Sequence, residues 1–411
     1  MNYRNLIALC LYGLVFVPAS LCAADKDSLL LSDYDFLESS DPWLTARNAA
    51  GLTRLSVDHL SDARLSFTHE WGYLADYYES PRAVALAADV ASYYRLSRRT
   101  VLYGSIGYDN YTGWQMAGSA FVNPTRMPFD IVEDSLTNLG RKHRDTYHLV
   151  GAFGTEISKG LSVGAKVDYT AANYAKYKDL RHKNSLMDMV VTAGISVPVV
   201  RNLVLGADFY YRRNTETVRF NTYGSSDRVY KSLVSYAAFY GQVEAFGEAG
   251  YADKNREMPF FSEQKGFEVQ GEWKPTDRIS WFNNFSWRNR QGYYGKKSPY
   301  TVSLNEHEGN IYEYHGRLSL HSNRALHRVD VNVQAENLQN DGNTYREQTG
   351  DNSSTYYEYY TPVKLSNKVW TTASVVYTGS WGLRQLTPEW TVAAAVSHQK
   401  TKQTAYVYPS Y

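Results

Sequence analysis

The sequence predicts an all-β protein, namely a transmembrane antiparallel β-barrel of about 14–16 strands with short periplasmic turns and long extracellular loops. Three observations predict it: an export signal, a strand-like alternation of apolar and polar residues, and an excess of tyrosine. The 411 residues include 36 tyrosines, against 15 phenylalanines and 9 tryptophans. Tyrosine is amphipathic and collects where an apolar medium meets water, as at the two interfaces of a membrane.

The start of the chain has the pattern of a cleaved signal peptide. Arg4 lies in a short positive region, residues 6–17 are apolar, and small residues precede Asp25. An apolar run of about a dozen residues is too short to span a membrane as a helix. We therefore predict export of the chain to the bacterial outer membrane after removal of residues 1–24.

Both cysteines of the chain, Cys10 and Cys22, lie in this predicted signal peptide. A lipid anchor on Cys22 is the alternative, although Leu21 is bulkier than such a site prefers. The exported remainder has no cysteine, so neither disulfides nor thiolate chemistry are expected in it. We divide it into a periplasmic N-terminal segment, 25–60, and an outer-membrane barrel, 61–411.

Alternation with a period of two runs through most of the barrel segment. Leu161, Val163, Ala165 and Val167, for example, alternate with polar residues and glycine. This pattern places one face of a strand in an apolar medium and the other in a polar one. It predicts strands at 62–72, 83–95, 100–111, 145–158, 161–171, 185–197, 203–213, 231–240, 242–250, 266–274, 278–288, 310–321, 326–337, 367–378 and 389–399, of which 242–250 is the least regular.

The predicted connections alternate between tight polar turns and long segments. Turns such as 158–160 and 322–325 contrast with the long segments 112–144, 172–184, 214–230, 251–265, 289–309 and 338–366. This asymmetry is typical of outer-membrane barrels, whereas the alternative, a soluble β-sandwich, predicts shorter strands and more even loops. The 15 predicted strands are an odd number, so either 401–411 returns as a strand, the sequence stops before the native C-terminus, or 242–250 is not a strand.

The polar face of the predicted strands carries many charged residues. An ionised side chain costs several kcal/mol near the middle of a bilayer, so these residues should face the lumen. The lumen-facing set is Asp89, Glu156, Lys166, Asp168, Asp208, Glu268, Glu272, Arg317, Asp330 and Glu336. Two interpretations stay open: a water-filled conduit, or a lumen closed by salt-bridged side chains.

The sequence excludes several classes of function. A formal net charge of +1 does not suit a polycationic nucleic-acid binder, so no nucleic-acid partner is expected. The ten histidines are scattered without metal-ligand spacing, and no nucleophile elbow or phosphate-binding loop occurs. We therefore expect no metal, no cofactor and no enzymatic activity. An outer-membrane hydrolase remains a distant alternative, because the residues of such a site come together only in space.

Two motifs carry a family resemblance. One is the stretch WLTARNAAGL at 43–52, and the other is FVNPTRMPFDIVE at 121–133 in the first long loop. With these motifs the chain resembles an uncharacterised family of Bacteroidota outer-membrane β-barrel proteins of unassigned function. The resemblance implies a partnership with a TonB-dependent uptake system, and it assigns no site residues.

The second motif also has a physical interpretation. Pro124 and Pro128 stiffen the loop, and apolar residues beside them can hold it in the barrel mouth. Pro128, Phe129, Asp130 and Ile131 are therefore the candidate constriction, although a loop folded over the rim fits as well. We predict a conduit for small polar solutes or nutrient uptake, and the alternative is a non-conducting accessory barrel of an uptake or secretion complex.

Overall fold

A computed structural model describes residues 33–133, 138–224, 227–247, 250–253, 257–298, 301–350, 355–384 and 387–406. The predicted signal peptide, 1–24, lies outside these residues. Within them, no helix is long and apolar enough to cross a membrane.

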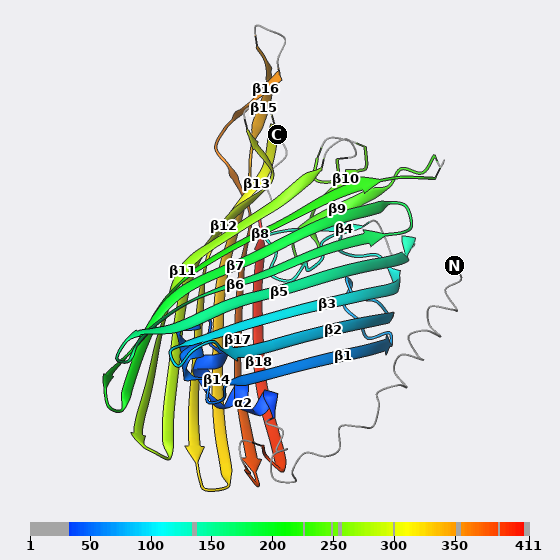
Figure 1. The fold of residues 1–411 in the computed structure, drawn as a ribbon. Helices are drawn as coiled ribbons and strands as arrows, with labels where there is room; N and C mark the ends of the chain where they lie inside the picture. Colours follow the sequence, from blue (N-terminus) through cyan, green and yellow to red (C-terminus); the bar gives the residue numbers. More distant parts are fainter. Residues whose placement is uncertain are drawn as a thin grey trace.

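One large antiparallel sheet of thirteen strands makes up most of the described chain. It curls around its own interior, and its strands follow one another in sequence order (Figure 1). We call it the wall. Its strands are β1 (His59–Trp71), β2 (Arg82–Arg95), β3 (Thr100–Met116), β5 (Gly140–Ser158), β6 (Leu161–Lys176), β7 (Arg181–Val200), β8 (Leu203–Asn221), β11 (Met258–Thr276), β12 (Ile279–Ser298), β13 (Thr301–His321), β14 (Ala325–Gly342), β17 (Val363–Trp381) and β18 (Trp390–Ala405).

The described wall thus has thirteen strands and not the predicted 14–16. Fifteen segments were predicted as wall strands. Two of them, 231–240 and 242–250, do not join the wall, which leaves thirteen. They form β9 (Lys231–Ala237) and β10 (Tyr240–Ala245), which pair with β4 (Asp130–Glu133) in a separate three-stranded sheet. Their alternating pattern indicated strands correctly, but a period of two does not say which sheet a strand joins.

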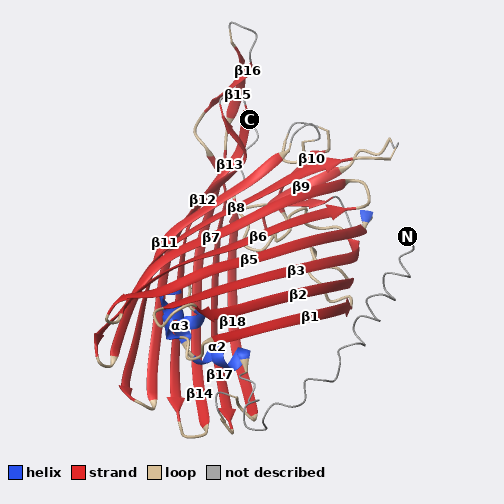
Figure 2. Cartoon of the chain, viewed as in Figure 1, coloured by secondary structure: helices blue, strands red, loops and turns tan. Residues whose placement is uncertain are grey.

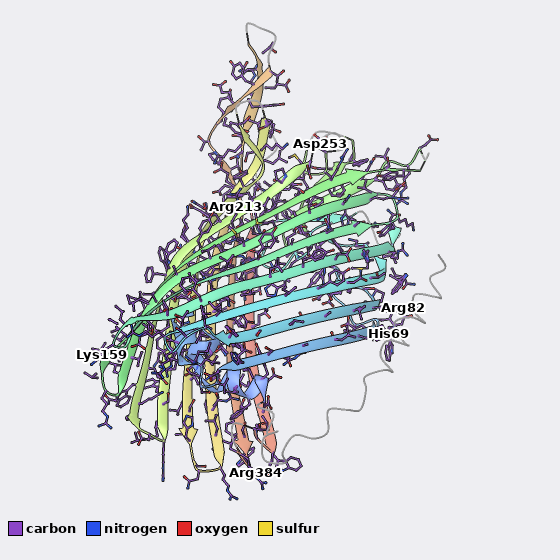
Figure 3. All side chains as sticks on the ribbon, viewed as in Figure 1. His69, Arg82, Lys159, Arg213, Asp253 and Arg384 are labelled. Atoms are coloured by element: carbon purple, nitrogen blue, oxygen red, sulfur yellow. The ribbon has the colours of Figure 1, made fainter. Side chains whose placement is uncertain are left out.

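The wall strands are 13 to 21 residues long, which is longer than predicted. The strands are longer at the ends where long loops were predicted to connect them. The segments 172–184 and 289–309, which were predicted to be loops, are therefore mostly strand. In Figure 3, Lys159 and Arg384 lie in short turns at one end of the wall, and Asp253 lies at the other end. We call these the short-turn end and the long-loop end.

The two edges of the wall are β1 and β18. In the described residues β1 pairs only with β2, and β18 pairs only with β17. Since neighbouring strands are antiparallel throughout and number thirteen, both edge strands run in the same direction. Among the described residues, the two edge strands of this curled sheet do not pair with each other.

The outer face of the wall is apolar along its whole width. Each of the thirteen strands exposes at least one large apolar side chain on this face. Examples, one from each strand in order, are Phe67, Val90, Ile106, Leu149, Val167, Ile195, Phe209, Val269, Phe285, Leu318, Val333, Val375 and Val396.

Tyrosines divide between the two faces of the wall. In the adjacent pair Tyr93–Tyr94, Tyr93 is buried inside and Tyr94 is exposed on the outer face. Others are buried at the long-loop end, such as Tyr251 and Tyr294. The tyrosine excess therefore serves the interior of the molecule as well as the outer face.

A small hairpin stands beyond the long-loop end of the wall (Figure 1). It consists of β15 (Tyr345–Thr349) and β16 (Thr355–Tyr359), and it contains part of the tyrosine-rich stretch 356–360. The hydroxyl of Tyr359 accepts a hydrogen bond from the backbone N–H of Ser303 at 2.9 Å, which ties the hairpin to β13.

The N-terminal segment fills the interior at the short-turn end. It contains α2 (Tyr34–Ser40), α3 (Pro42–Thr45) and the 3₁₀ helix η1 (Ala49–Arg54), and Figure 2 shows the α-helices against the lower part of the wall. We call residues 33–55 the plug. Its apolar residues pack with Leu60, Tyr93 and Val101 of β1, β2 and β3.

Glycines on four neighbouring strands make room for the plug. A Cβ atom on Gly154 or Gly164 would lie within 2.5 Å of backbone atoms of Ala49. Those on Gly194 and Gly206 would lie 2.4 Å from the Asn48 side chain and 2.7 Å from the Trp43 ring. Glycine inside a strand commonly marks such a close approach of another segment.

A second segment fills the interior at the long-loop end. Residues 117–133 fold inward from between β3 and β5, and their end, β4, pairs with β9. We call residues 117–133 together with β9 and β10 the cap. Phe121, Phe129 and Ile131 are buried there in an apolar cluster with Phe260 and Tyr294 of the wall.

The glycine row generates a prediction. Gly154→Ala should destabilise the protein by about 1–3 kcal/mol, because the added methyl group collides with the backbone of η1. Gly151→Ala on the same strand is the matched control, since a Cβ there meets nothing within 4 Å. Urea or thermal unfolding midpoints measure both variants. Equal stability of the two would contradict the close packing of η1 on β5.

Candidate functional site

A cavity of about 1370 Å³ lies between the plug and the cap. Arg47 of the plug lines it on one side, and residues 122–127 of the cap line it on the other. Wall strands, with many arginines and carboxylates among them, and the β1–β2 connection at 72–80 supply the rest. The interior is therefore neither an open pore nor a fully packed core in its middle section.

Arg47 attaches the plug to the wall beside this cavity. Its guanidinium donates to Glu268 of β11 at 2.5 Å and to Glu313 of β13 at 2.7 Å. Glu268 is fully buried, so its charge depends on this partner. Glu313 also pairs with Arg288 of β12. One arginine of the plug thus joins two strands of the wall.

A second attachment surrounds Trp43, which is itself buried. Its indole N–H donates to Glu272 Oε2 at 3.0 Å, and its ring meets Phe282 edge-on at 5.4 Å. Arg54 of the plug also binds Glu272, at 2.7 Å. The plug therefore contributes the cations and the indole N–H that satisfy two buried carboxylates of β11.

The cap is attached mainly through its backbone. Lys142, Asn184, Arg290 and Lys368 donate to cap carbonyl groups at 2.7 to 2.9 Å, and Glu216 accepts from the N–H of Val122. These five side chains come from five different wall strands. Contacts to so many strands hold the cap as a folded element and not as a loose loop.

Glu133 completes this attachment at the base of the cap. Its carboxylate binds the ammonium groups of Lys142, at 2.7 Å, and Lys176, and both lysines are buried. Burial alone would raise the pKa of Glu133, but Lys142, His182 and Lys176 outweigh it, so the pKa lies below the ordinary value. The lowered pKa keeps this attachment ionised at neutral pH and weakens it only when the pH falls through that value.

All ten predicted lumen-facing residues lie on strands of the wall, and several contact the plug, the cap or the cavity. Glu268 and Glu272 bind the plug, and Arg317 donates to the carbonyl of Ser39 at 2.7 Å. Glu336 binds Arg126 of the cap. Lys166 and Asp168 line the cavity.

The other four lie apart from the cavity. Asp208 accepts from Gln270 at 2.6 Å and is buried behind the plug, and Asp330 pairs with Arg317 and His315. Glu156 accepts from the N–H of Gly160 in a short turn. Asp89 is paired in register with Arg64 of β1.

The candidate constriction residues are buried in the base of the cap. Phe129 and Ile131 are fully buried, and Asp130 accepts from Ser119 and Tyr77, each at 2.6 Å. Pro128 is buried beside them. The part of the loop that faces the cavity is its tip, 122–127.

Sequence reasoning missed most of the cavity's arginines. Arg212, Arg288 and Arg290 share the strand periodicity of the predicted inner face, so the same alternation extended along β8 and β12 finds them. Arg47 and Arg126 carry no such signal, because they lie in irregular segments whose partners are far away in the sequence.

Catalytic arrangements are sparse in the described residues. No group of three His, Cys, Asp or Glu residues there is placed to hold a metal ion. One hydroxyl–imidazole–carboxylate chain exists, in which Thr112 Oγ1 lies 2.8 Å from His143 Nδ1 and His143 Nε2 lies 3.2 Å from Asp145. Tyr108 and Asn110 also donate to Asp145, so this chain belongs to a wider polar network.

The fold and the site together define an all-β protein with an apolar outer face, in which a plug and a cap lie on either side of a cavity lined by many charged residues. The chain belongs to the family described as "Family of unknown function (DUF6850)", whose model matches residues 49–411. This confirms the resemblance to an uncharacterised family, while the Bacteroidota origin stays a prediction. A comparison with curated proteins gave no match.

Solved structures similar to this chain include outer-membrane receptors and transporters. The alcaligin outer-membrane receptor FauA of Bordetella pertussis is 10% identical, with a TM-score of 0.39; the match covers 86% of this chain and 57% of the receptor. The toluene transporter TbuX of Ralstonia pickettii is 11% identical, with a TM-score of 0.37 and coverage of 88% and 92%. The chain thus spans little more than half of FauA.

The plug attachment generates a prediction. Arg47→Met should destabilise the protein by about 3 kcal/mol, the lower end for breaking a buried ion pair, because Arg47 is itself partly open to the cavity. Arg64→Met is the matched control. Arg64 also binds two carboxylates, Asp35 and Asp62, but it is exposed, so its loss should cost less than about 1 kcal/mol. Chemical unfolding of both variants measures the difference, and a larger loss in the control would refute the assignment.

Proposed function

We propose that this chain forms the wall of a bacterial outer-membrane β-barrel and acts as a gated conduit for small polar solutes. Export through the signal peptide 1–24 belongs to the proposal, as does a periplasmic location of the short-turn end. One observation carries it: a charged cavity lies between a plug and a cap, inside a sheet whose outer face is apolar.

The outer face supports a membrane location. Every wall strand exposes large apolar side chains on it, and an apolar surface of this extent is not expected to face water. A tilted strand needs about 9–11 residues to cross a bilayer. The wall strands exceed this, so their long-loop ends would extend beyond the membrane.

The interior supports transport of polar solutes. A polar cavity favours hydrated or hydrogen-bonding molecules over apolar ones. The plug and the cap narrow the interior on either side of the cavity, so passage requires one of them to move. The plug is the better candidate for movement, because among the described residues it continues into the wall at one end only, through β1, whereas each segment of the cap lies between two wall strands.

The same closure supports the alternative function, a non-conducting accessory barrel. If the plug never moves, no solute passes, and the protein could function only by binding partners through its outer surfaces and the hairpin β15–β16. A TonB-dependent uptake system is the partner that we propose for either reading. A hydrolase is less favoured, because threonine nucleophiles are activated by a free N-terminal amine, which Thr112 lacks.

Conductance in planar lipid bilayers tests the conduit. The full-length protein should open rarely, and the double variant Trp43→Ala/Arg47→Met should open in frequent discrete steps, because its plug is loosened. Arg384→Met is the control: it removes an exposed ion pair with Glu389 that does not involve the plug, and it should behave as the unmodified protein does. Complete silence of the double variant, with the fold verified by circular dichroism, would refute the conduit and favour the accessory barrel.

A further inference from the structure

We propose that the cap side of the cavity is a binding site for a sugar that carries a carboxylate group. This inference rests on the proposed function, since it names the class of solute that the conduit would take. Two features support it: a row of side chains on three neighbouring strands, and the tip of the cap, 122–127, which lies close to this row.

Arg212, Gln264 and Arg290 form this row. Gln264 of β11 is in register with Arg212 of β8 on one side and with Arg290 of β12 on the other. All three residues line the cavity. Neighbouring strands lie about 4.8 Å apart, so the backbones of the two arginines are about 10 Å from each other. The side-chain amide of Gln264 lies between them. This width suits one sugar ring.

Gln264 lacks a partner that its burial requires. Its side chain is 6% exposed, and its amide oxygen has no hydrogen-bond partner among the described residues. Buried polar side-chain atoms in proteins are almost always hydrogen-bonded. A small shift of the Gln264 side chain toward the cavity, which it lines, would let this oxygen accept a hydrogen bond from a hydroxyl group of a bound molecule, and sugars offer hydroxyl groups on every side.

Arg126 brings a third guanidinium to the row. It lies at the cap tip with φ +58°, a left-handed conformation that is uncommon for a residue with a side chain. Its guanidinium reaches Glu336 of β14 at 3.4 Å and Thr372 of β17 at 3.3 Å. Strained backbone of this kind is concentrated at functional sites.

The arginines of this group differ in how closely they are paired. Glu336 is shared by Arg126 and Arg290, and Asp188 pairs with Arg212. Arg126 and Arg290 therefore share one carboxylate, and Arg126 reaches it only at 3.4 Å. Guanidinium groups bind carboxylates in a bidentate geometry, so a carboxylate on the ligand would give Arg126 a closer partner.

The surroundings favour a sugar acid over a small simple anion. Ser262 lies beside Arg290, whose Nε donates to its hydroxyl at 3.2 Å, and the hydroxyl of Thr372 lies beside Arg126. Donors and acceptors thus alternate around the arginines. The cavity of about 1370 Å³ also has room for a solute larger than a simple anion.

Calorimetric titration of the full-length protein in detergent tests this site. The probes are D-galacturonate, its neutral counterpart D-galactose, and acetate. Galacturonate should bind at least about tenfold more tightly than either of the others, because only it offers both the carboxylate and the hydroxyl groups.

Gln264→Glu is the decisive variant. It places a carboxylate between Arg212 and Arg290, so galacturonate affinity should fall at least about tenfold while the new ion pairs preserve the fold. Gln399→Glu on β18 makes the same change outside this cavity and should leave the affinity unaltered. Arg126→Gln removes the cap contribution and should lower the affinity for galacturonate more than that for galactose.

Three results would overturn the site. These are equal affinities for galacturonate and galactose, unchanged binding by Gln264→Glu, or no binding by the folded protein below a Kd of about 10 mM. None of them bears on the bilayer conductance of the loosened plug. Failure of the ligand site is therefore distinguishable from failure of the conduit.

Discussion

The structure depends on one constraint, the cost of placing an ionised side chain in an apolar medium. Alternation along each wall strand puts the apolar residues on the outer face and the charges on the inner face. Inside, a charge without a partner is equally costly, so the interior must supply counter-charges. The plug and the cap help to meet this need: Arg47 and Arg54 pair with carboxylates of the wall, and Glu133 pairs with two buried lysines.

This constraint also explains why the cavity lies where it does. The plug packs at the short-turn end because four strands carry glycine there, and the cap packs at the long-loop end against aromatic side chains such as Phe260. Between the two ends the wall carries long arginines, glutamines and carboxylates that pair with one another across strands. Such side chains line the cavity with polar and charged groups.

The strand pattern could be predicted from the sequence because an apolar outer face and a polar inner face impose a strict period of two. Thirteen of the predicted segments correspond to wall strands, and their short-turn ends agree within a few residues. The long-loop ends could not be predicted, because beyond the apolar belt both faces of a strand meet polar surroundings and the alternation fades. Tyr293 and Lys297 of β12, for example, resemble loop residues.

The site was less predictable for a related reason. The inner-face carboxylates follow from alternation, but their partners Arg47 and Arg126 lie in irregular segments and meet them only through long-range folding. The neighbourhood of Arg212, Gln264 and Arg290 depends on the register between strands, which no single strand encodes. The two motifs that carry the family resemblance proved to be parts of the plug and the cap.

The central claim is that the wall separates lipid on one face from a polar interior on the other. Spin labels placed one at a time at 266–273 of β11 test it most directly, in protein reconstituted into lipid vesicles. We predict that spin labels at Phe267, Val269, Gly271 and Trp273 are accessible to oxygen dissolved in the lipid, whereas labels at the even-numbered positions are not. Equal oxygen accessibility at odd and even positions would contradict it.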